Sequence, residues 1–186
     1  LGTDLLEHPE KAEGANNIVI VGGGVVGCET AHWLANEYGK NVTVLEMLPH
    51  FMMGVCTANR GHLLHYLEKS GVRLYNCTKV KAVAKDGVYV EQNQSQTVPD
   101  PYNTWQPLLP PNIPNPMEKA IKEEIVEKKI PADLIVLAMG GKADETFFFE
   151  AGEEHLAKEI YNIGDSSRAG RVLEAVRGAY HLAVRI

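Results

Sequence analysis

A glycine-rich turn between an apolar run and a helical pattern constrains this sequence more than any other feature. Residues Ile18–Val21 form a continuous apolar run, which is typical of a strand buried on both faces. Residues 22–27 then read Gly-Gly-Gly-Val-Val-Gly, residues 25–37 have a helical pattern that ends near Gly39, and residues 41–47 form a second β-rich run. The order of strand, helix and strand predicts a βαβ unit in a doubly wound parallel sheet.

The spacing Gly22-x-Gly24-x-x-Gly27 predicts a binding site for the pyrophosphate of a dinucleotide. Gly22 permits the tight turn, Gly24 lets the phosphates approach the backbone, and Gly27 lets the helix pack close to the strand. The first amides of the helix, including those of Val25 and Val26, would offer unpaired N–H groups and the positive end of the helix dipole. A tight turn without a ligand is the alternative.

Two carboxylates refine this prediction. Glu46 stands at the end of the second β-rich run, where it would accept hydrogen bonds from the ribose hydroxyls and repel a 2′-phosphate. NAD(H) is therefore favoured over NADP(H), while FAD stays open because its ADP half makes the same contacts, and a solvated strand-end Glu is the structural alternative. Glu29, near the start of the helix, could reach the nicotinamide end or only stabilise the helix dipole.

A second candidate segment lies at the end of residues 133–139, which we expect to form another buried strand with the apolar run of residues 134–137. Open α/β sheets bind ligands at the carboxyl ends of their strands, so Met139, Gly140 and Gly141 are further cofactor-binding candidates. Their glycines allow the backbone to approach a ligand closely. A plain turn explains the same residues, and both interpretations stay open.

A third candidate segment precedes the last helical pattern. We expect a short strand at residues 160–163, followed by Gly164 and Asp165 and a closing helix over residues 171–186. The carboxylate of Asp165 could bind sugar-like hydroxyls of a cofactor. A helix cap or an Asx turn is the alternative.

The remaining patterns complete an α/β fold, namely a Rossmann-like three-layer βαβ sheet that carries an antiparallel β-meander. Residues 57–70 predict a helix that Gly71 ends, residues 72–75 a third parallel strand, and residues 79–84 and 88–91 a hairpin. Three less regular segments are expected to lie outside this pattern: a linker with a short amphipathic piece at residues 1–14, a stretch of undecided helix or strand at 118–129, and a connection around residues 147–149.

A proline-rich excursion interrupts the domain at residues 92–117. It holds seven prolines between Pro99 and Pro116 and is long for a loop in a compact domain. We expect it to run over the surface. It could also dock a partner or a second copy of the chain, which would make the protein a homo-oligomer.

Composition excludes several classes of function. The formal net charge of −6 argues against a nucleic-acid or anionic-membrane partner, and no apolar run approaches the roughly 20 residues of a membrane helix.

The cysteines, Cys28, Cys56 and Cys77, form no close pair, so this chain lacks the pattern of a disulfide framework or an iron–sulfur site. We expect a cytoplasmic protein and no metal site, because the histidines have no ligand-like spacing with cysteines or carboxylates.

Three segments together resemble a known family. Residues Ile18–Glu46 resemble the NAD-binding domain of two-dinucleotide-fold flavoprotein reductases, and Ala132–Gly141 resembles their A-T-G segment, with Met139 in place of Thr. Residues Ile160–Ile186 resemble their closing, flavin-contacting segment. The letters GCETA and the long helix after IGD are most similar to the NADH:flavin oxidoreductase group of 2,4-dienoyl-CoA reductase, enoate reductase and trimethylamine dehydrogenase.

This resemblance implies that different segments of the chain bind different cofactors. The glycine loop and Glu46 would hold NAD(H), and Asp165 would contact FAD. Hydride from NADH would pass to FAD, and its two electrons would pass onward one at a time, through an iron–sulfur cluster to FMN in an N-terminal barrel, for reduction of an enoate-type or similar substrate. The protein would supply position and electrostatics for its cofactors.

The sequence departs from that family in ways that suggest a fragment. It has one glycine fingerprint instead of two, lacks the barrel and the cysteine cluster, begins without Met and stops inside a helical pattern. We therefore expect an NAD(H)-binding domain at residues 15–145 and the closing segment of an incomplete FAD domain at 146–186. The N-terminal flavin barrel and the other part of the FAD domain would be its partners, and the isolated chain would be inactive. A non-catalytic module that binds ADP or another nucleotide is the alternative function.

Overall fold

Two compact units make up the computed structural model, residues 1–139 and residues 140–186. It describes residues 1–105, 109, 112–116 and 118–186. No helix among these residues is long and apolar enough to cross a membrane. The assignment of the second unit to an FAD domain stays a prediction.

A four-stranded parallel sheet in the order β3-β2-β1-β7 forms the centre of the first unit. β1 pairs in parallel with β2 on one side and with β7 on the other, and Val21 lies opposite both Leu45 and Leu137. The carboxyl ends of these three strands therefore lie together at one edge. The strands are β1 (Asn17–Val21), β2 (Asn41–Leu45), β3 (Arg73–Tyr75) and β7 (Leu134–Leu137).

A second sheet confirms the predicted hairpin and extends it. β4 (Thr78–Ala84) and β5 (Gly87–Asn93) pair antiparallel, and β5 also pairs antiparallel with β6 (Ile125–Pro131). The stretch at residues 118–129, which its sequence left undecided, thus enters a strand at Ile125. Its β-branched residues suit the pleated surface of the sheet.

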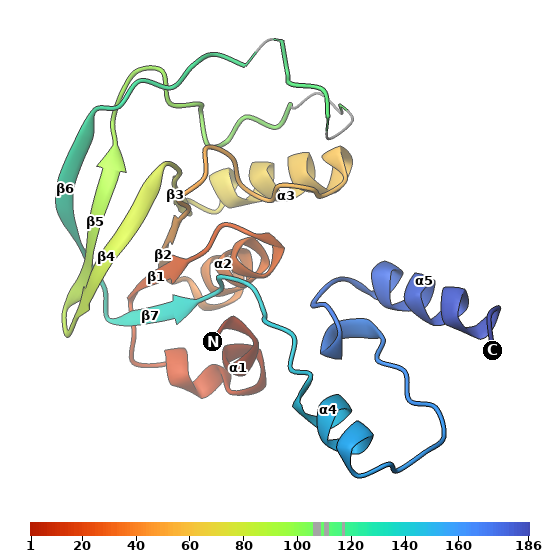
Figure 1. The fold of residues 1–186 in the computed structure, drawn as a ribbon. Helices are drawn as coiled ribbons and strands as arrows, with labels where there is room; N and C mark the ends of the chain where they lie inside the picture. The colour runs from red at the N-terminus through yellow and green to blue at the C-terminus, as the bar shows by residue number, and fades with distance from the viewer. Residues whose placement is uncertain (106–108, 110–111, 117) are drawn as a thin grey trace. The chain divides into compact units, whose positions relative to one another are not determined.

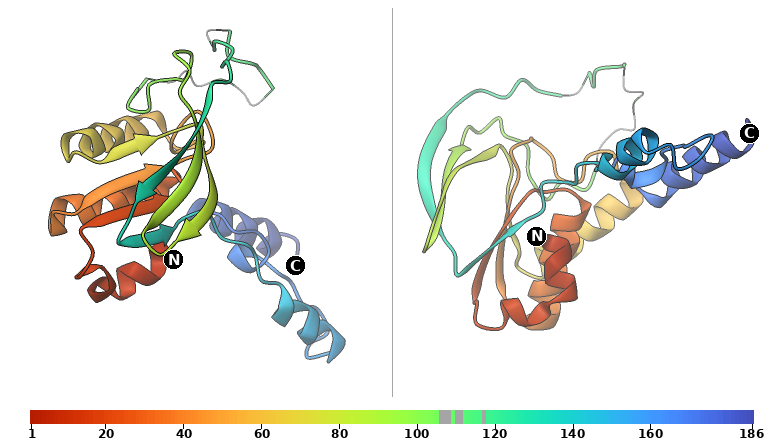
Figure 2. Two further views of the ribbon diagram at one scale, coloured as in Figure 1. Left: turned by 90° about the vertical axis from the view of Figure 1, so that its left-hand side faces the viewer. Right: turned by 60° about the horizontal axis from the view of Figure 1, so that its bottom comes forward.

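Three layers result from the alternation of side chains along β1. Ile18 and Ile20 pack in a core with the helices, whereas Val19 and Val21 pack in a second core with the antiparallel sheet. Figures 1 and 2 show helices α2 (Val25–Tyr38) and α3 (Thr57–Lys69) on one face of the parallel sheet and β4, β5 and β6 on the other. The predicted three-layer fold is confirmed.

The N-terminal segment packs against this domain more closely than a linker would. It forms α1 (Gly2–Glu7) and the 3₁₀ helix η1 (Pro9–Ala12). Leu5 and Ala12 are buried in the core with the helices. Burial of these apolar side chains stabilises the segment against the domain.

The first part of the proline-rich excursion packs against the rest of the first unit. Asn76 Nδ2 donates to the carbonyls of Pro49 and Pro99 at 2.6 and 2.8 Å. The Tyr102 hydroxyl donates to Val72 O at 2.6 Å and accepts the Leu74 N–H at 3.1 Å. Tyr102 of the excursion thus covers the open edge of β3. The prolines at 107, 110 and 111 lie outside the described residues, so the docking hypothesis stays open.

The second unit corrects two predictions. Residues 147–149, expected in a connection, lie in α4 (Thr146–Glu153), where Asp144 Oδ1 accepts the Thr146 N–H at 3.1 Å at the start of the helix. Residues 160–163 are not a strand, because no described strand offers them a ladder of backbone hydrogen bonds. The unit ends with η2 (Gly164–Ser166) and α5 (Val172–Ala183).

Candidate nucleotide-binding site

The glycine loop begins where β1 lies between β2 and β7. Gly22 has φ +113°, which L side chains rarely adopt, and its N–H donates to Leu45 O at 2.9 Å. A Cβ on Gly22 would lie 2.3 Å from Ala138 O and 3.1 Å from Met139 N. The structure therefore brings the glycine loop and Met139 together at the carboxyl edge of the sheet, at the point where the strand order reverses.

The other two fingerprint glycines have different surroundings. A Cβ on Gly27 would lie 2.0 Å from Gly22 O, so α2 packs directly on the loop that precedes it. Gly24 is exposed, its φ of −72° suits any residue, and a Cβ there would meet nothing within 4 Å. The fold itself therefore requires Gly22 and Gly27 to be glycine but does not require it of Gly24.

The N-terminus of α2 offers donors to this open space. Gly24 is the N-cap residue, and no described side chain caps the helix. The amides of Val25, Val26 and Gly27 have no acceptor within the helix, because no preceding turn supplies one. Together with the helix dipole they favour an anion at this position.

Glu46 is fixed beside the loop by two backbone donors. Its Oε2 accepts the Gly23 N–H at 2.7 Å, and its Oε1 accepts the Leu48 N–H at 2.8 Å. The carboxylate is half-buried and each of its oxygens retains a lone pair for another donor. The structure thus places a preoriented acceptor next to the candidate pyrophosphate site.

Phe51 and Arg60 pack around the loop at Gly23, and the sequence patterns did not assign these two residues to the site. A Cβ on Gly23 would lie 2.3 Å from Phe51 Cδ1, and Gly23 O accepts the Met52 N–H at 2.8 Å. Arg60 is buried and its Nε donates to Phe51 O at 2.9 Å. A usable signal was present, since Arg60 falls on the helical stripe of Leu64 and Leu67, where a charged side chain is unusual.

Three titratable groups surround the loop. Burial raises the pKa of Cys28 to about 12, with Glu46 and Glu29 adding to the effect, so this thiol stays protonated at neutral pH. Burial and the nearby Arg60 lower the pKa of His50, which is therefore neutral at pH 7. Glu29 is exposed on α2, and its reach toward a nicotinamide stays a prediction.

The remaining candidates are not all placed relative to the loop. Met139 is 69% exposed at the end of the first unit, and Gly140, with φ +92°, begins the second unit together with Gly141. Gly164 has φ +70°, and Asp165 Oδ1 accepts the Gly170 N–H at 3.1 Å. Asp165 thus has a local partner of the kind expected for a turn, and its contact with a cofactor stays a prediction.

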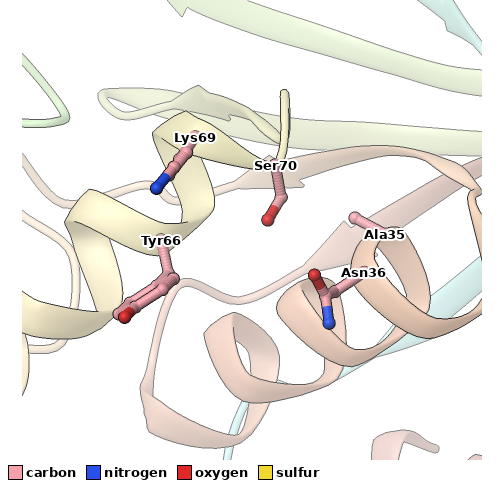
Figure 3. Close-up of a pocket in the computed structure, with 5 residues that line it drawn as sticks. All are labelled: Ala35, Asn36, Tyr66, Lys69 and Ser70. Carbon is pink, nitrogen blue, oxygen red and sulfur yellow. The ribbon is translucent and has the colours of Figure 1, made fainter.

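A separate cleft of about 400 Å³ lies between the C-terminal ends of α2 and α3 (Figure 3). None of the predicted site residues lines it, and the glycine loop lies at the opposite end of α2. It is lined by Ala35, Asn36, Tyr66, Lys69 and Ser70.

Similar proteins cover almost all of this chain. NADH oxidase of Thermoanaerobacter brockii is 26% identical over 183 residues, which make up 98% of this chain and 23% of that protein. Bilirubin reductase of Mediterraneibacter gnavus is 27% identical over 95% of this chain and 22% of its own length. Cinnamate reductase of Clostridium sporogenes is 22% identical, with 95% and 22% covered. The chain spans less than a quarter of the length of these oxidoreductases.

Solved structures and a family model agree with the fold. A complex of 2-naphthoyl-CoA reductase with 2-naphthoyl-CoA superposes with a TM-score of 0.72 at 25% identity, covering 99% of this chain and 23% of the other. Histamine dehydrogenase from Rhizobium sp. 4-9 shares the fold, with a TM-score of 0.66 at 14% identity over 92% of this chain and 22% of the other. The family model matches residues 3–163. The chain therefore belongs to the pyridine nucleotide-disulphide oxidoreductase family, whose flavoproteins bind NAD(H) and FAD.

Proposed function

We propose that this chain is the NADH-binding part of a flavin-dependent oxidoreductase of the 2,4-dienoyl-CoA reductase, enoate reductase and trimethylamine dehydrogenase group. The pyrophosphate of NADH binds the glycine loop, and its adenosine ribose binds Glu46. NADH supplies a hydride and FAD accepts it when both are bound. The residues of this chain bind the dinucleotide and orient it for that transfer.

The main support for this proposal is the environment of Gly24. Asn, Asp or Ser would cap α2 at least as well as glycine, and neither the backbone angles nor the packing requires glycine there. A ligand that approaches the backbone does require it. The amides of Val25 and Val26, next in the chain, are the donors that a pyrophosphate would use.

Glu46 supports NADH over NADPH. The Gly23 and Leu48 amides hold its carboxylate in place, so little side-chain entropy is lost when it accepts the ribose hydroxyls. A 2′-phosphate at the same position would meet a fixed negative charge. Arg60 does not neutralise a 2′-phosphate there, because its guanidinium is buried against backbone carbonyls.

The rest of the proposed enzyme lies outside this sequence. The second unit has Ala151 as its only buried residue and therefore no core of its own. This favours a missing FAD half-domain as the partner that covers it, with Asp165 as a contact of FAD. FMN and an iron–sulfur cluster would belong to the flavin barrel, since Cys28, Cys56 and Cys77 form no cluster site here. Relatives that reduce cinnamate and 2-naphthoyl-CoA support an enoate-type or similar substrate.

Calorimetric titration of the 186-residue chain tests the proposal. We expect NADH and NAD to bind and NADPH to bind more weakly, and we expect Glu46→Arg to reverse this preference. Glu37→Arg is the matched control, because Glu37 is exposed at the far end of α2 and its substitution changes the net charge equally.

Two results would count against the proposal. If the chain is folded by circular dichroism and neither NADH nor NAD binds at millimolar concentration, the nicotinamide assignment is wrong. If ADP binds but NADH fails to reduce the flavin of the complete enzyme in stopped-flow experiments, the chain is a nucleotide-binding module without a role in hydride transfer.

A further inference from the structure

Arg60 occupies an unusual place for a charged side chain. It lies on α3, is 3% exposed, and shares the buried stripe of that helix with Leu64 and Leu67. Burial of a charge is unfavourable unless hydrogen bonds compensate it. Here the guanidinium donates to backbone carbonyls of two segments that lie far from each other in the sequence.

The guanidinium joins the loop after β2 to the proline-rich excursion. Nε donates to Phe51 O at 2.9 Å, and Nη1 donates to Asn103 O at 3.0 Å and to Thr104 O at 3.4 Å. Such charge-assisted bonds are about twice as strong as neutral ones. Arg60 therefore fixes the position of the Phe51 backbone from inside the domain.

Phe51 passes this constraint to the glycine loop. Its side chain is fully buried, and its ring occupies the space where a Cβ on Gly23 would lie, with Cδ1 at 2.3 Å. The next residue, Met52, donates its N–H to Gly23 O at 2.8 Å. Gly23 is thus held from both sides, by Glu46 at its N–H and by the Phe51–Met52 segment at its Cα and carbonyl.

We infer that Arg60 is a positioning residue of the nucleotide site, which acts through Phe51 on Gly23 and so sets the orientation of the adjoining Gly24 amide. The inference rests on the proposed function, since it concerns the same nucleotide. Arg60 is 3% exposed, and its Nε and Nη1 donate to three backbone carbonyls, so it acts on the ligand through Phe51 and not by contact. Without it, the Phe51 segment would move relative to the loop, and the donors to the phosphates would lose their fixed geometry.

Two readouts on the 186-residue chain test this inference. We expect Arg60→Met to weaken NADH binding roughly tenfold, which is the lower range for loss of a hydrogen bond from a charged donor. We also expect faster hydrogen exchange at the Gly23 and Met52 amides in the absence of nucleotide. Arg60→Lys keeps the charge and one donor, so it should recover part of the NADH affinity and part of the exchange protection. This variant replaces Arg60→Met if the latter does not fold.

Asp133→Ala is the control for a general loss of stability. Asp133 accepts the Asn16 and Asn17 amides at 3.1 and 2.8 Å, at the amino end of β1, which is the end opposite to the glycine loop. We expect this variant to be less stable but to bind NADH as the unchanged chain does.

Unchanged exchange at Gly23 and Met52 in a folded Arg60→Met variant would overturn the inference, whether or not NADH binds. Equal loss of affinity in the Asp133→Ala variant would overturn it too, because the effect would then be one of stability. If the unchanged chain binds no NADH, the proposed function fails, while the exchange measurement still decides whether Arg60 positions Gly23.

Discussion

Gly24 and Gly27 are glycines for different reasons. Gly27 has no space for a methyl group, because Gly22 O would lie 2.0 Å from its Cβ. Gly24 has that space, and it stands at the N-cap of α2, where a short polar side chain normally stabilises a helix. At the scale of single residues, the fold explains Gly27, and the proposed binding of a pyrophosphate would explain Gly24.

This difference predicts that Gly24→Asp and Gly27→Ala change the free energy of unfolding in opposite directions. Gly24→Asp should raise the free energy of unfolding by a few tenths of a kcal/mol, because Asp caps a helix well and complements its dipole. The same variant should bind NADH at least about tenfold more weakly, because the new carboxylate takes up the amides and repels the pyrophosphate. Urea unfolding and calorimetric titration measure the two quantities.

Gly27→Ala should lower the free energy of unfolding. Its Cβ would overlap the loop, and overpacking of this kind costs roughly 1–3 kcal/mol of stability. A Gly24→Asp variant that binds NADH as tightly as the unchanged chain would show that the phosphates do not reach this loop.

At the scale of elements, Tyr102 protects the open edge of the parallel sheet. β3 is an edge strand, and the Tyr102 hydroxyl pairs with Val72 O and Leu74 N–H, as a neighbouring strand would. Unpaired edges invite association between chains. The part of the excursion that carries Tyr102 therefore contributes to the fold.

Tyr102→Phe should lower the free energy of unfolding by about 1–3 kcal/mol, since it leaves a partly buried donor and acceptor without their partner. Tyr89→Phe on β5 is the matched control, because Tyr89 is an exposed tyrosine of the same unit. Denaturant unfolding followed by circular dichroism gives the comparison. Equal stability of the two variants would show that the Tyr102 hydroxyl does not support the edge.

The predictability of the elements depended on how local their causes are. The run of β1, the glycine turn and α2 were predicted because strand burial, turn geometry and helix pattern act within about 20 residues. The segment at 160–163 was predicted wrongly as a strand, because a strand depends on a partner that sequence does not reveal. α4 was missed because three successive phenylalanines show no helical period.

The site followed the same rule. Gly22, Gly27 and Glu46 came together as expected, since the βαβ unit places them at one edge. Phe51 and Arg60 could not be assigned to the site, because their effect depends on contacts between α3, a loop and an excursion. Such contacts follow from the tertiary structure and leave no short motif.

At the scale of the whole molecule, the two units differ in how they are stabilised. The first unit has two apolar cores, one on each face of its parallel sheet. The second buries only Ala151, and α5 leaves Val172, Val176 and Tyr180 exposed. Segments with few buried apolar contacts open most readily.

Limited proteolysis should therefore cut the chain first within residues 140–186. The remaining product, close to residues 1–139, should resist further cleavage and retain NADH binding, since it holds the glycine loop and Glu46. Mass spectrometry of a digestion time course identifies the cuts. Early cleavage within β1, α2 or β2 would contradict this picture of the two units.

Amide chemical-shift mapping shows residue by residue whether NADH binds at the glycine loop. When NADH is added to the ¹⁵N-labelled chain, we expect the largest changes in chemical shift at residues 22–27 and at Glu46 and Leu48. The cleft between α2 and α3 provides the internal comparison. If the largest changes occur at Asn36, Tyr66 and Ser70, or if no amide changes at millimolar NADH, then NADH does not bind at the glycine loop.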